Sequence, residues 1–187
     1  MGTEPWQRQK VRGRDQVLRS VEERANAYAE RVVQDVREAM HDYEVDMYRL
    51  VLAVGKRYGM DKAFEIMSDT VAEKRLRWLD QVVPELELTG TDVEKGLALY
   101  LQYFQPKEDE FRVVEQAAER VTFRRKDFVN AISYACDALG LDVIEVNNQV
   151  YARAMNLMFA QVNLRLEHVF LAYRDGWYDE MIKMRVS

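Results

Sequence analysis

The chain has 187 residues, of which 48% are hydrophobic and 32% are charged, and its formal net charge at pH 7 is −5. This length and composition fit a soluble domain with its own core, and the negative charge argues against a general nucleic-acid surface, because phosphate binding needs a basic face. No apolar run approaches the roughly 20 residues that span a bilayer, and the N-terminus lacks the apolar stretch of a signal peptide, so we expect a cytoplasmic protein with no nucleic-acid and no membrane partner.

The first predicted segment is a basic arm. Arg8, Lys10, Arg12 and Arg14 alternate along a stretch without acidic residues. Chain termini are usually loosely ordered, so we predict a flexible arm over 1–14. The alternative is an arm that contacts nucleic acid or another anionic partner.

A long amphipathic helix is predicted next, over 15–58. Apolar residues recur at steps of three and four from Val17 to Val54, which keeps them on one helical stripe, and Asp15 is the predicted cap. So long a stripe is either one helix or two helices that break near His41. A long helix with an apolar stripe usually packs against a second copy, so we predict a homo-oligomer that associates through the N-terminal helix.

Two further helices are predicted before the strands. The apolar spacing indicates a helix over 61–81, which Pro84 stops. Thr91 and Glu94 have the spacing of a capping box, in which each side chain satisfies a backbone N–H at the start of a helix. This third helix ends before Pro106.

The period of the pattern then changes from helical to two. Alternation within 111–123 predicts a β-hairpin. A second hairpin is predicted more strongly, because the alternation over 164–173 leads into Asp175 and Gly176, the residue pair that a tight primed turn prefers. An extended run to Val186 completes this second hairpin.

Two helices separate the hairpins in the predicted order. Asp127 caps the first and Gly140 closes it, while the second runs from Val143 to about Met155.

The order of these elements predicts an α+β fold, since the helices are segregated from antiparallel strands. We expect a helical N-terminal half with a long amphipathic helix, and a C-terminal antiparallel sheet of two hairpins with intervening helices. The prediction is a single α+β domain over 15–187, in which 15–58 is a helical extension and 60–187 is the core.

His168 is one of two histidines, and it lies mid-strand in phase with apolar residues, so it points toward the core or a cavity in it. A buried imidazole needs a polar partner, which Glu145, Asp175 or Asp179 could supply. Since histidine is suited to general base catalysis, we name His168 and Asp175 as candidate catalytic residues. The alternative is a satisfied histidine of the core.

Arg124 and Arg125 stand between a predicted strand and the start of a helix. Two guanidiniums beside a helix N-terminus are typical of a corner that binds a carboxylate or phosphate, so we name both as candidate substrate-binding residues. The alternative is solvated charges at a strand end. Tyr173 and Tyr178 flank the turn of the last hairpin, where they either brace the hairpin or contact the ligand, and they complete the candidate site.

Other catalytic and metal patterns in the sequence are incomplete. Glu38 and His41 form a Glu-x-x-His unit, which di-iron bundles use twice with further glutamates, so we predict no metal and no cofactor; the alternative is a helical protein that binds iron or manganese through Glu38 and His41. Cys136 is the only cysteine, which excludes intrachain disulfides and cysteine-based zinc sites. Cys136 and His168 are the one pair that could form a thiolate nucleophile; the alternative for Cys136 is a small core residue.

Three short segments carry a family resemblance. Residues 121–125 (Val-Thr-Phe-Arg-Arg), 138–140 (Ala-Leu-Gly) and 175–178 (Asp-Gly-Trp-Tyr) follow one another as do the Val-Thr-x-Cys-Pro, Leu-Gly and Gly-Asp-x-Cys motifs of L-2-amino-thiazoline-4-carboxylic acid hydrolases. With its helical N-terminal half, the chain from about residue 41 to residue 185 resembles this family. The resemblance implies the family's fold and pocket, and an enzyme or binding protein that acts on a small anionic substrate; for an enzyme, the expected reaction is hydrolysis of a C–N or C–S bond.

The cysteines of that family are missing from these positions. Arg124 stands where the family has its strand cysteine, and Asn147 and Asn148 fall where it has a cysteine and an acid, so thiol chemistry is not carried over. The resulting hypothesis is that Arg124 and Arg125 hold the carboxylate of a substrate while His168 acts as the base. The alternative is a non-catalytic accessory subunit or homo-oligomeric scaffold that associates through the N-terminal helix.

Overall fold

One unbroken helix, α1 (Arg14–Tyr58), forms the start of the described chain. The computed structural model describes residues 14–82, 86, 88–127 and 130–185. Of the predicted basic arm it therefore describes Arg14 alone, and the side chain of Asp15 also lies outside the described part. Of the two possibilities left open for the long stripe, the single helix is the one observed, because α1 continues through His41.

The chain divides into two compact units, Met1–Ala39 and Met40–Ser187. The described part of the first unit is the N-terminal portion of α1. The C-terminal portion of α1 belongs to the second unit, where Tyr48 and Val51 are buried in a core cluster with residues of the following helices. All elements after α1 belong to this second unit.

Helices α2 (Met60–Val82) and α3 (Asp92–Phe104) confirm the two predicted helices. The predicted capping box is present at the start of α3. The hydroxyl of Thr91 accepts a hydrogen bond from the Glu94 backbone N–H at 3.3 Å, and the Glu94 carboxylate accepts one from the Thr91 backbone N–H at 2.8 Å. Two donors that the first turn of a helix leaves unpaired are thus satisfied locally.

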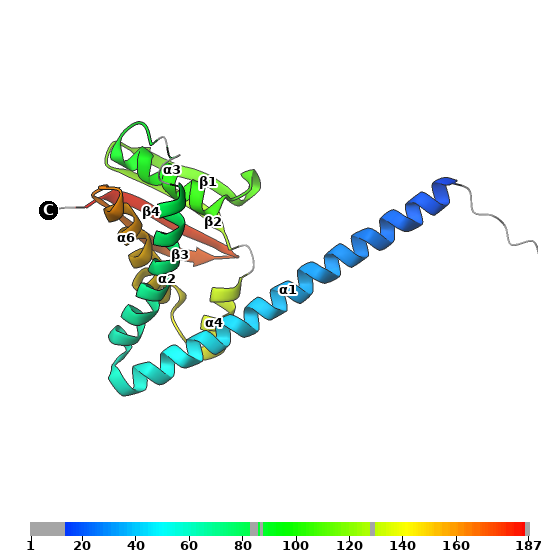
Figure 1. Ribbon diagram of the computed structural model, residues 1–187, viewed down its shortest axis with the longest axis horizontal. Coiled ribbons are helices and arrows are strands. Elements are labelled where there is room, and N and C mark those ends of the chain that lie inside the picture. The colour runs from blue at the N-terminus through cyan, green and yellow to red at the C-terminus, as the bar shows by residue number, and fades with distance from the viewer. Residues whose placement is uncertain (1–13, 83–85, 87, 128–129, 186–187) are drawn as a thin grey trace, which may run out of the picture. The chain divides into compact units, whose positions relative to one another are not determined.

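Four antiparallel strands form one sheet in the order β1-β2-β4-β3, built from two hairpins as predicted. The strands are β1 (Phe111–Ala117), β2 (Arg120–Lys126), β3 (Leu166–Arg174) and β4 (Trp177–Met184). Between β3 and β4, Asp175 and Gly176 have φ angles of 51° and 78°, as both central residues of a primed turn require. The architecture is α+β, with a helical N-terminal half and a C-terminal antiparallel sheet (Figure 1).

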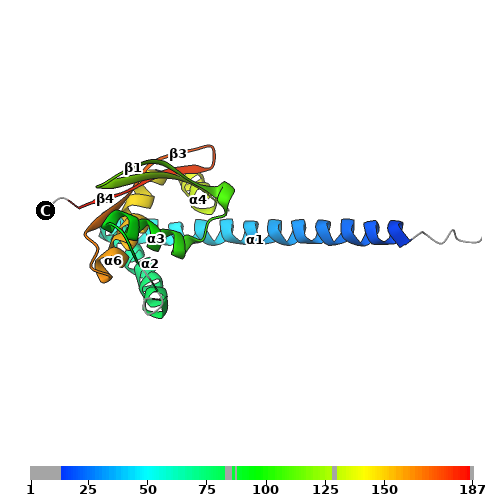
Figure 2. The ribbon, with the colours of Figure 1, turned by 90° about the horizontal axis from the view of Figure 1, so that it is seen from above.

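The helices of the second unit gather on one face of the sheet, which Figure 2 shows with α2, α3 and α6 on the same side of the strands. The core cluster between them and the sheet consists of twelve buried residues. They are Leu79, Val93, Leu99, Tyr100, Val121, Phe123, Met155, Met158, Phe159, Leu164, Leu166 and Ile182. A Cβ atom at Gly96 of α3 would overlap the end of the Leu166 side chain, so the missing side chain allows α3 to approach the sheet closely.

The segment between the hairpins differs from the prediction in two ways. Helix α4 (Ala131–Leu139) begins after Asn130, so Asp127 is not its cap, and Phe128, the predicted first residue, lies outside the described residues. Asp127 instead accepts a hydrogen bond of 3.1 Å from the hydroxyl of Ser133 in the first turn of α4.

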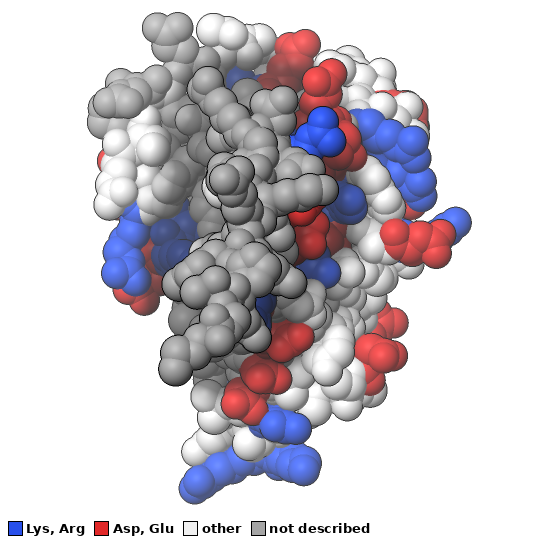
Figure 3. All heavy atoms as spheres, turned by 90° about the vertical axis from the view of Figure 1, so that its right-hand side faces the viewer, with Lys and Arg blue, Asp and Glu red and all other residues white. Residues whose placement is uncertain are grey.

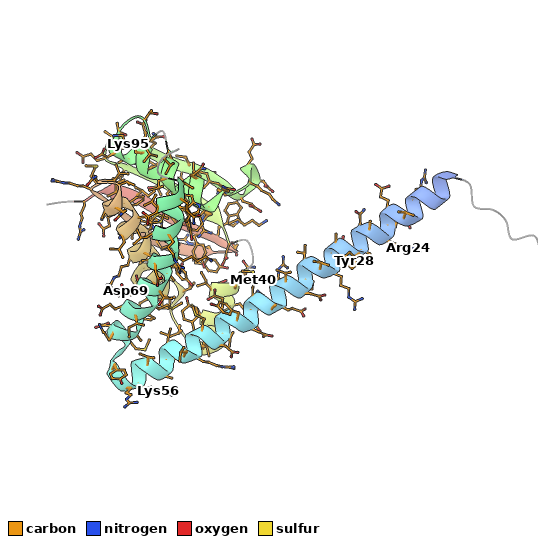
Figure 4. All side chains as sticks on the ribbon, in the orientation of Figure 1. Arg24, Tyr28, Met40, Lys56, Asp69 and Lys95 are labelled. Atoms are coloured by element: carbon orange, nitrogen blue, oxygen red, sulfur yellow. The ribbon has the colours of Figure 1, made fainter. Side chains whose placement is uncertain are left out.

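The second difference lies in the predicted helix from Val143. This helix is longer than predicted and has three parts, α5 (Val143–Val146), the π-helical segment η3 (Asn147–Ala152) and α6 (Arg153–Gln161). A π-helical turn holds one extra residue per turn and is frequent at functional sites. Helix α6 is tied to α2 by the ion pair between Arg153 and Asp69 at 3.5 Å, and Asp69 is labelled in Figure 4.

The free edge of strand β3 is covered by two asparagine side chains. The amide of Asn148 accepts from the Phe170 backbone N–H and donates to the Phe170 carbonyl, both at 2.9 Å. The Asn156 amide oxygen accepts from the His168 backbone N–H at 2.7 Å. These side chains stand in for a fifth strand, since edge backbone groups must otherwise find water or another chain.

Within the described residues, none of the helices is both long and apolar enough to cross a membrane. Figure 3 shows one face of the molecule, and among the described residues visible there Lys and Arg lie interspersed with Asp and Glu and with uncharged residues.

We expect Asn148→Ala to lower the free energy of unfolding by about 1–3 kcal/mol, because it leaves the Phe170 backbone N–H and carbonyl without partners at a buried residue. Urea denaturation monitored by circular dichroism measures the change. Asn26→Ala, at an exposed asparagine of α1, is the control and should change stability by less than about 0.5 kcal/mol. Equal effects from both variants would show that Asn148 does not support the sheet edge.

Candidate functional site

A cavity of about 340 Å³ lies within the second unit, between the helices and one end of the sheet. Its walls come from α1, α2, α3, α4, η3 and strands β2, β3 and β4. Six aromatic residues line it, namely Tyr43, Tyr103, Phe104, Tyr151, Phe170 and Tyr178. Its charged residues are Glu44, Lys74, Arg75, Arg125 and Asp127. A concave, mostly apolar space with a few converging polar groups is the usual form of a small-molecule site.

A buried carboxylate anchors one wall of this cavity. Glu180 of β4 is completely inaccessible to solvent. Its Oε1 accepts from Arg125 Nε at 3.0 Å, and its Oε2 accepts from the Tyr100 hydroxyl and from His168 Nε2, each at 2.8 Å. Four elements, α3, β2, β3 and β4, therefore meet at one carboxylate.

The protonation of this network follows from its pairing. Burial disfavours the charged form of Glu180, but the Arg125 charge and the hydrogen bonds from His168 and Tyr100 outweigh burial and hold the Glu180 pKa below its ordinary value. Burial lowers the pKa of His168 more than Glu180 raises it, so the imidazole is neutral and donates from Nε2. His168 Nδ1 is buried without a hydrogen-bond partner in the described residues.

Arg125 is held in a fixed orientation by this network. Besides Glu180, its Nε donates to the Tyr100 hydroxyl at 2.7 Å, and its guanidinium lies over the rings of Phe104 and Tyr178, with centroid distances of 4.9 and 5.3 Å. Burial works to lower the Arg125 pKa, but the Glu180 charge raises it above the ordinary value. Arg125 is thus a permanent cation in the cavity wall with one carboxylate partner.

Arg75 of α2 is a second buried cation in the same wall, and it differs from Arg125 in its partners. The side chain is 4% exposed, donates from Nη1 to the Tyr151 carbonyl at 2.7 Å, and lies over the rings of Tyr103, Phe104 and Tyr151. Among the described residues, Nε has no acceptor and no carboxylate forms an ion pair with this guanidinium. Burial lowers the Arg75 pKa, and the interaction with the Tyr103 side chain, which acts to raise it, does not outweigh burial.

Two carboxyl groups form a separate acidic part of the cavity. Glu44 of α1 has a buried Oε2 without a partner among the described residues, and burial and then the charge of Asp127 raise its pKa. Asp127 is 8% exposed and accepts hydrogen bonds from Ser133 and Tyr178 at 3.1 Å. Burial raises the Asp127 pKa despite these hydrogen bonds. Two neighbouring carboxyl groups with raised pKa values hold a proton more readily than isolated ones.

The structure separates the two predicted catalytic residues. His168 is 2% exposed, pairs with Glu180 and does not line the cavity, whereas Asp175 is exposed in the β3–β4 turn. Of the three acids expected as partners of His168, none forms a hydrogen bond with its ring in the described residues. The geometry favours a positioning role for His168, which holds the Glu180 carboxylate in place for Arg125.

The four predicted binding residues divide between the two faces of the sheet. Arg125 and Tyr178 line the cavity, and Tyr173 reaches its acidic part through the Ser133 hydroxyl, to which it donates at 2.9 Å. Arg124 lies on the opposite face, where it forms an ion pair with Asp179. Neighbouring residues of a strand point to opposite faces, so the two arginines cannot hold one carboxylate together.

The thiol and metal patterns do not form sites in the described residues. Burial and then nearby carboxyl groups raise the pKa of Cys136 to about 12, which disfavours a thiolate, and no hydrogen bond joins it to His168. His41 stacks on the ring of Tyr134 at a centroid distance of 4.3 Å. No group of three or more His, Cys, Asp or Glu side chains is close enough to hold a metal ion within that part of the chain.

Sequence reasoning missed Arg75, Glu44, Asp127 and Glu180 as members of the site. For Arg75 and Glu180, the sequence did contain a signal. Arg75 falls on the apolar stripe of its helix, between Ala72 and Leu79, and Glu180 alternates in phase with buried residues of its strand. A charged residue on a buried face is uncommon unless it is paired or functional, so each position pointed to a buried polar network.

No family model, no curated protein and no solved structure matches this chain.

We expect Glu180→Gln to lower the free energy of unfolding by about 3–5 kcal/mol, because it leaves Arg125 as a buried cation without a counter-charge. Urea denaturation measures this loss. Glu167→Gln is the control from the same hairpin: its carboxylate pairs with Lys183 at 3.2 Å in a half-exposed position, where ion pairs contribute about 1 kcal/mol or less. A loss no larger than that of the control would contradict the central role of Glu180.

Proposed function

We propose that this protein binds a small organic anion in the cavity, with Arg75 as the counter-charge. The observation that carries the proposal is a buried guanidinium on the cavity wall whose Nε has no acceptor and which has no carboxylate partner among the described residues. A buried charge is costly unless it is paired, and a carboxylate ligand would pair it. This agrees with the small anionic substrate expected from the sequence, but with Arg75 in place of Arg124.

The charges on the wall around Arg75 favour an anion over a cation as the binding partner of this wall. The buried charged groups of this wall are the guanidiniums of Arg75 and Arg125 and the carboxylate of Glu180, while His168 is neutral and Glu44 and Asp127 belong to the separate acidic part of the cavity. One positive charge is therefore left over on this wall. The exposed Lys74 adds a further positive charge at the cavity.

Hydrolysis of a C–N or C–S bond, which the family resemblance implies, stays a prediction. Its acid–base groups would be Glu44 and Asp127, because both line the cavity and have raised pKa values. Carboxyl groups with pKa values moved toward neutrality are suited to proton transfer. His168 would support this chemistry only by positioning Glu180 and Arg125.

Isothermal titration calorimetry with 3-phenylpropanoate tests the proposal, since this probe combines a carboxylate with a ring that suits the aromatic lining. We expect Arg75→Met to weaken binding by at least tenfold, as the loss of one charge-assisted contact of about 1.5–3 kcal/mol requires. The variant should fold, because replacing a buried charge by an apolar side chain is often neutral or stabilising. Arg77→Met, at an exposed position of α2 paired with Glu73, is the control and should bind normally. Absence of binding to the unmodified protein would contradict the proposal.

A second candidate function is a homo-oligomeric scaffold, and a specific pattern in α1 favours it. Ala25, Ala29, Val32, Val36 and Ala39 are spaced four, three, four and three residues apart, which is the seam of a coiled coil. Val32 and Val36 are 41% and 52% exposed. The large apolar residues that flank this seam include Tyr28, which is 71% exposed and labelled on α1 in Figure 4. We propose a second copy of the chain as the partner, since it presents the same heptad seam in the same length.

For this second candidate, we expect the double variant Val32→Glu and Val36→Glu to reduce the mass in solution to that of one chain, because two charges enter the seam. Light scattering coupled to size-exclusion chromatography measures the mass. The control places the same two charges on the other side of α1, as Ala27→Glu and Gln34→Glu, and should keep the oligomer. A mass of one chain for the unmodified protein would contradict the proposed homo-oligomeric scaffold.

A further inference from the structure

We infer that the ligand of the cavity is a zwitterion, an apolar or aromatic α-amino acid, whose carboxylate binds Arg75 and whose ammonium group binds Glu44 and Asp127. This inference rests on the proposed function and adds the second, cationic group of the ligand. It follows from the arrangement of charges on the two sides of one cavity.

The basic end of the cavity, at Arg75, and the acidic end, at Glu44, each have one buried polar atom without a hydrogen-bond partner among the described residues. Arg75 offers a buried donor, Nε, that has no acceptor, and Glu44 offers a buried acceptor, Oε2, that has no donor; both statements hold for the described residues. No ion pair joins Arg75 to Glu44 there, so the two groups do not satisfy each other. A ligand that carries only a carboxylate would complete the first group and leave the second unpaired, which costs free energy in a buried place.

The acidic end suits an ammonium group. Asp127 lies near enough to Glu44 for its charge to act on the Glu44 carboxyl group. Like charges at short distance are disfavoured unless a proton or a cation stands between them. An ammonium group has three donors, so it can bind Glu44 Oε2 and Asp127 together.

The two ends line one cavity of about 340 Å³, which selects a short spacing between the ligand's charges. Tyr151 of the π-helical segment contacts the elements that carry both ends. Its carbonyl accepts a hydrogen bond from Arg75 Nη1 at 2.7 Å, and its hydroxyl accepts one at 3.2 Å from Tyr48, which follows Glu44 by about one turn of α1. The carboxylate and ammonium groups of an α-amino acid are separated by a single carbon, which gives a short spacing of this kind.

The rest of the wall suits an apolar or aromatic side chain. Tyr103, Phe104, Phe170 and Tyr178 present rings to the cavity, and Met47 adds an apolar side chain. Aromatic rings favour stacked or edge-to-face contacts with another ring. A cavity of about 340 Å³ has the size of small-molecule sites at the lower end of their range, which fits one amino acid.

Three matched probes test this inference by calorimetry: L-phenylalanine, 3-phenylpropanoate, which lacks the amino group, and 2-phenylethylamine, which lacks the carboxylate. We expect L-phenylalanine to bind at least tenfold more tightly than either analogue. Glu44→Gln should remove its advantage over 3-phenylpropanoate, and Arg75→Met should remove its advantage over 2-phenylethylamine. Asp46→Asn, at an exposed residue of α1 paired with Arg49, is the control and should leave all three affinities unchanged.

The outcomes separate this inference from the proposed function. If 3-phenylpropanoate binds as tightly as L-phenylalanine, and Arg75→Met weakens both, the site for an anion stands and the zwitterion is wrong. If neither carboxylate probe binds the unmodified protein, both proposals fail. Should Glu44→Gln unfold the protein, the ranking of the three probes on the unmodified chain still decides the question.

Discussion

The fold of the second unit depends on one buried carboxylate that must be fully paired. Moving a carboxylate from water into a protein interior costs several kcal/mol, and Glu180 is completely buried. Its three hydrogen bonds come from a helix and two strands, through Tyr100, Arg125 and His168. Each of these elements is therefore held in one position relative to β4, because a displaced element would leave the carboxylate without a donor.

The hydrogen bonds of Glu180 also fix the orientation of side chains in the cavity wall. Arg125 takes its orientation from Glu180, and its guanidinium in turn lies over the rings of Phe104 and Tyr178, which line the cavity. Since rings and charge are fixed before any ligand arrives, little conformational entropy is lost on binding. Arg75 belongs to the same region, since its charge contributes to lowering the pKa of His168, but it has no carboxylate partner within the described residues. The anchored charge supports the fold, and the unpaired charge is available to a ligand.

The sequence predicted local structure well and the site only in part, and the reason is visible in strand β3. The hairpins, the capping box at Thr91 and the Asp175-Gly176 turn depend on neighbouring residues, so their signals are local. The partner of His168 depends on the register between strands. In a regular ladder that starts with Arg174 opposite Trp177, Glu180 would face Leu171, out of phase with His168. The irregularity between Phe170 and Ala172 shifts the register, sets Phe170 opposite Glu180 and brings Glu180 to the face of His168. Alternation alone does not reveal such a bulge.

The pairing of Glu180 links the two properties of the site, stability and ligand binding. The regular ladder between β2 and β4 brings Arg125 and Glu180 to the same face of the sheet, and the bulge in β3 adds His168 as a further donor. Because Glu180 pairs with Arg125, Arg75 is the buried cation of this wall without a carboxylate partner among the described residues, and its charge is tied to the free energy of the folded state. Any ligand that binds the folded chain alone stabilises it in proportion to the logarithm of its concentration over its dissociation constant. An anion that pairs with Arg75 therefore stabilises the fold and fills the site by one and the same contact, so melting temperature and occupancy must rise together in this protein.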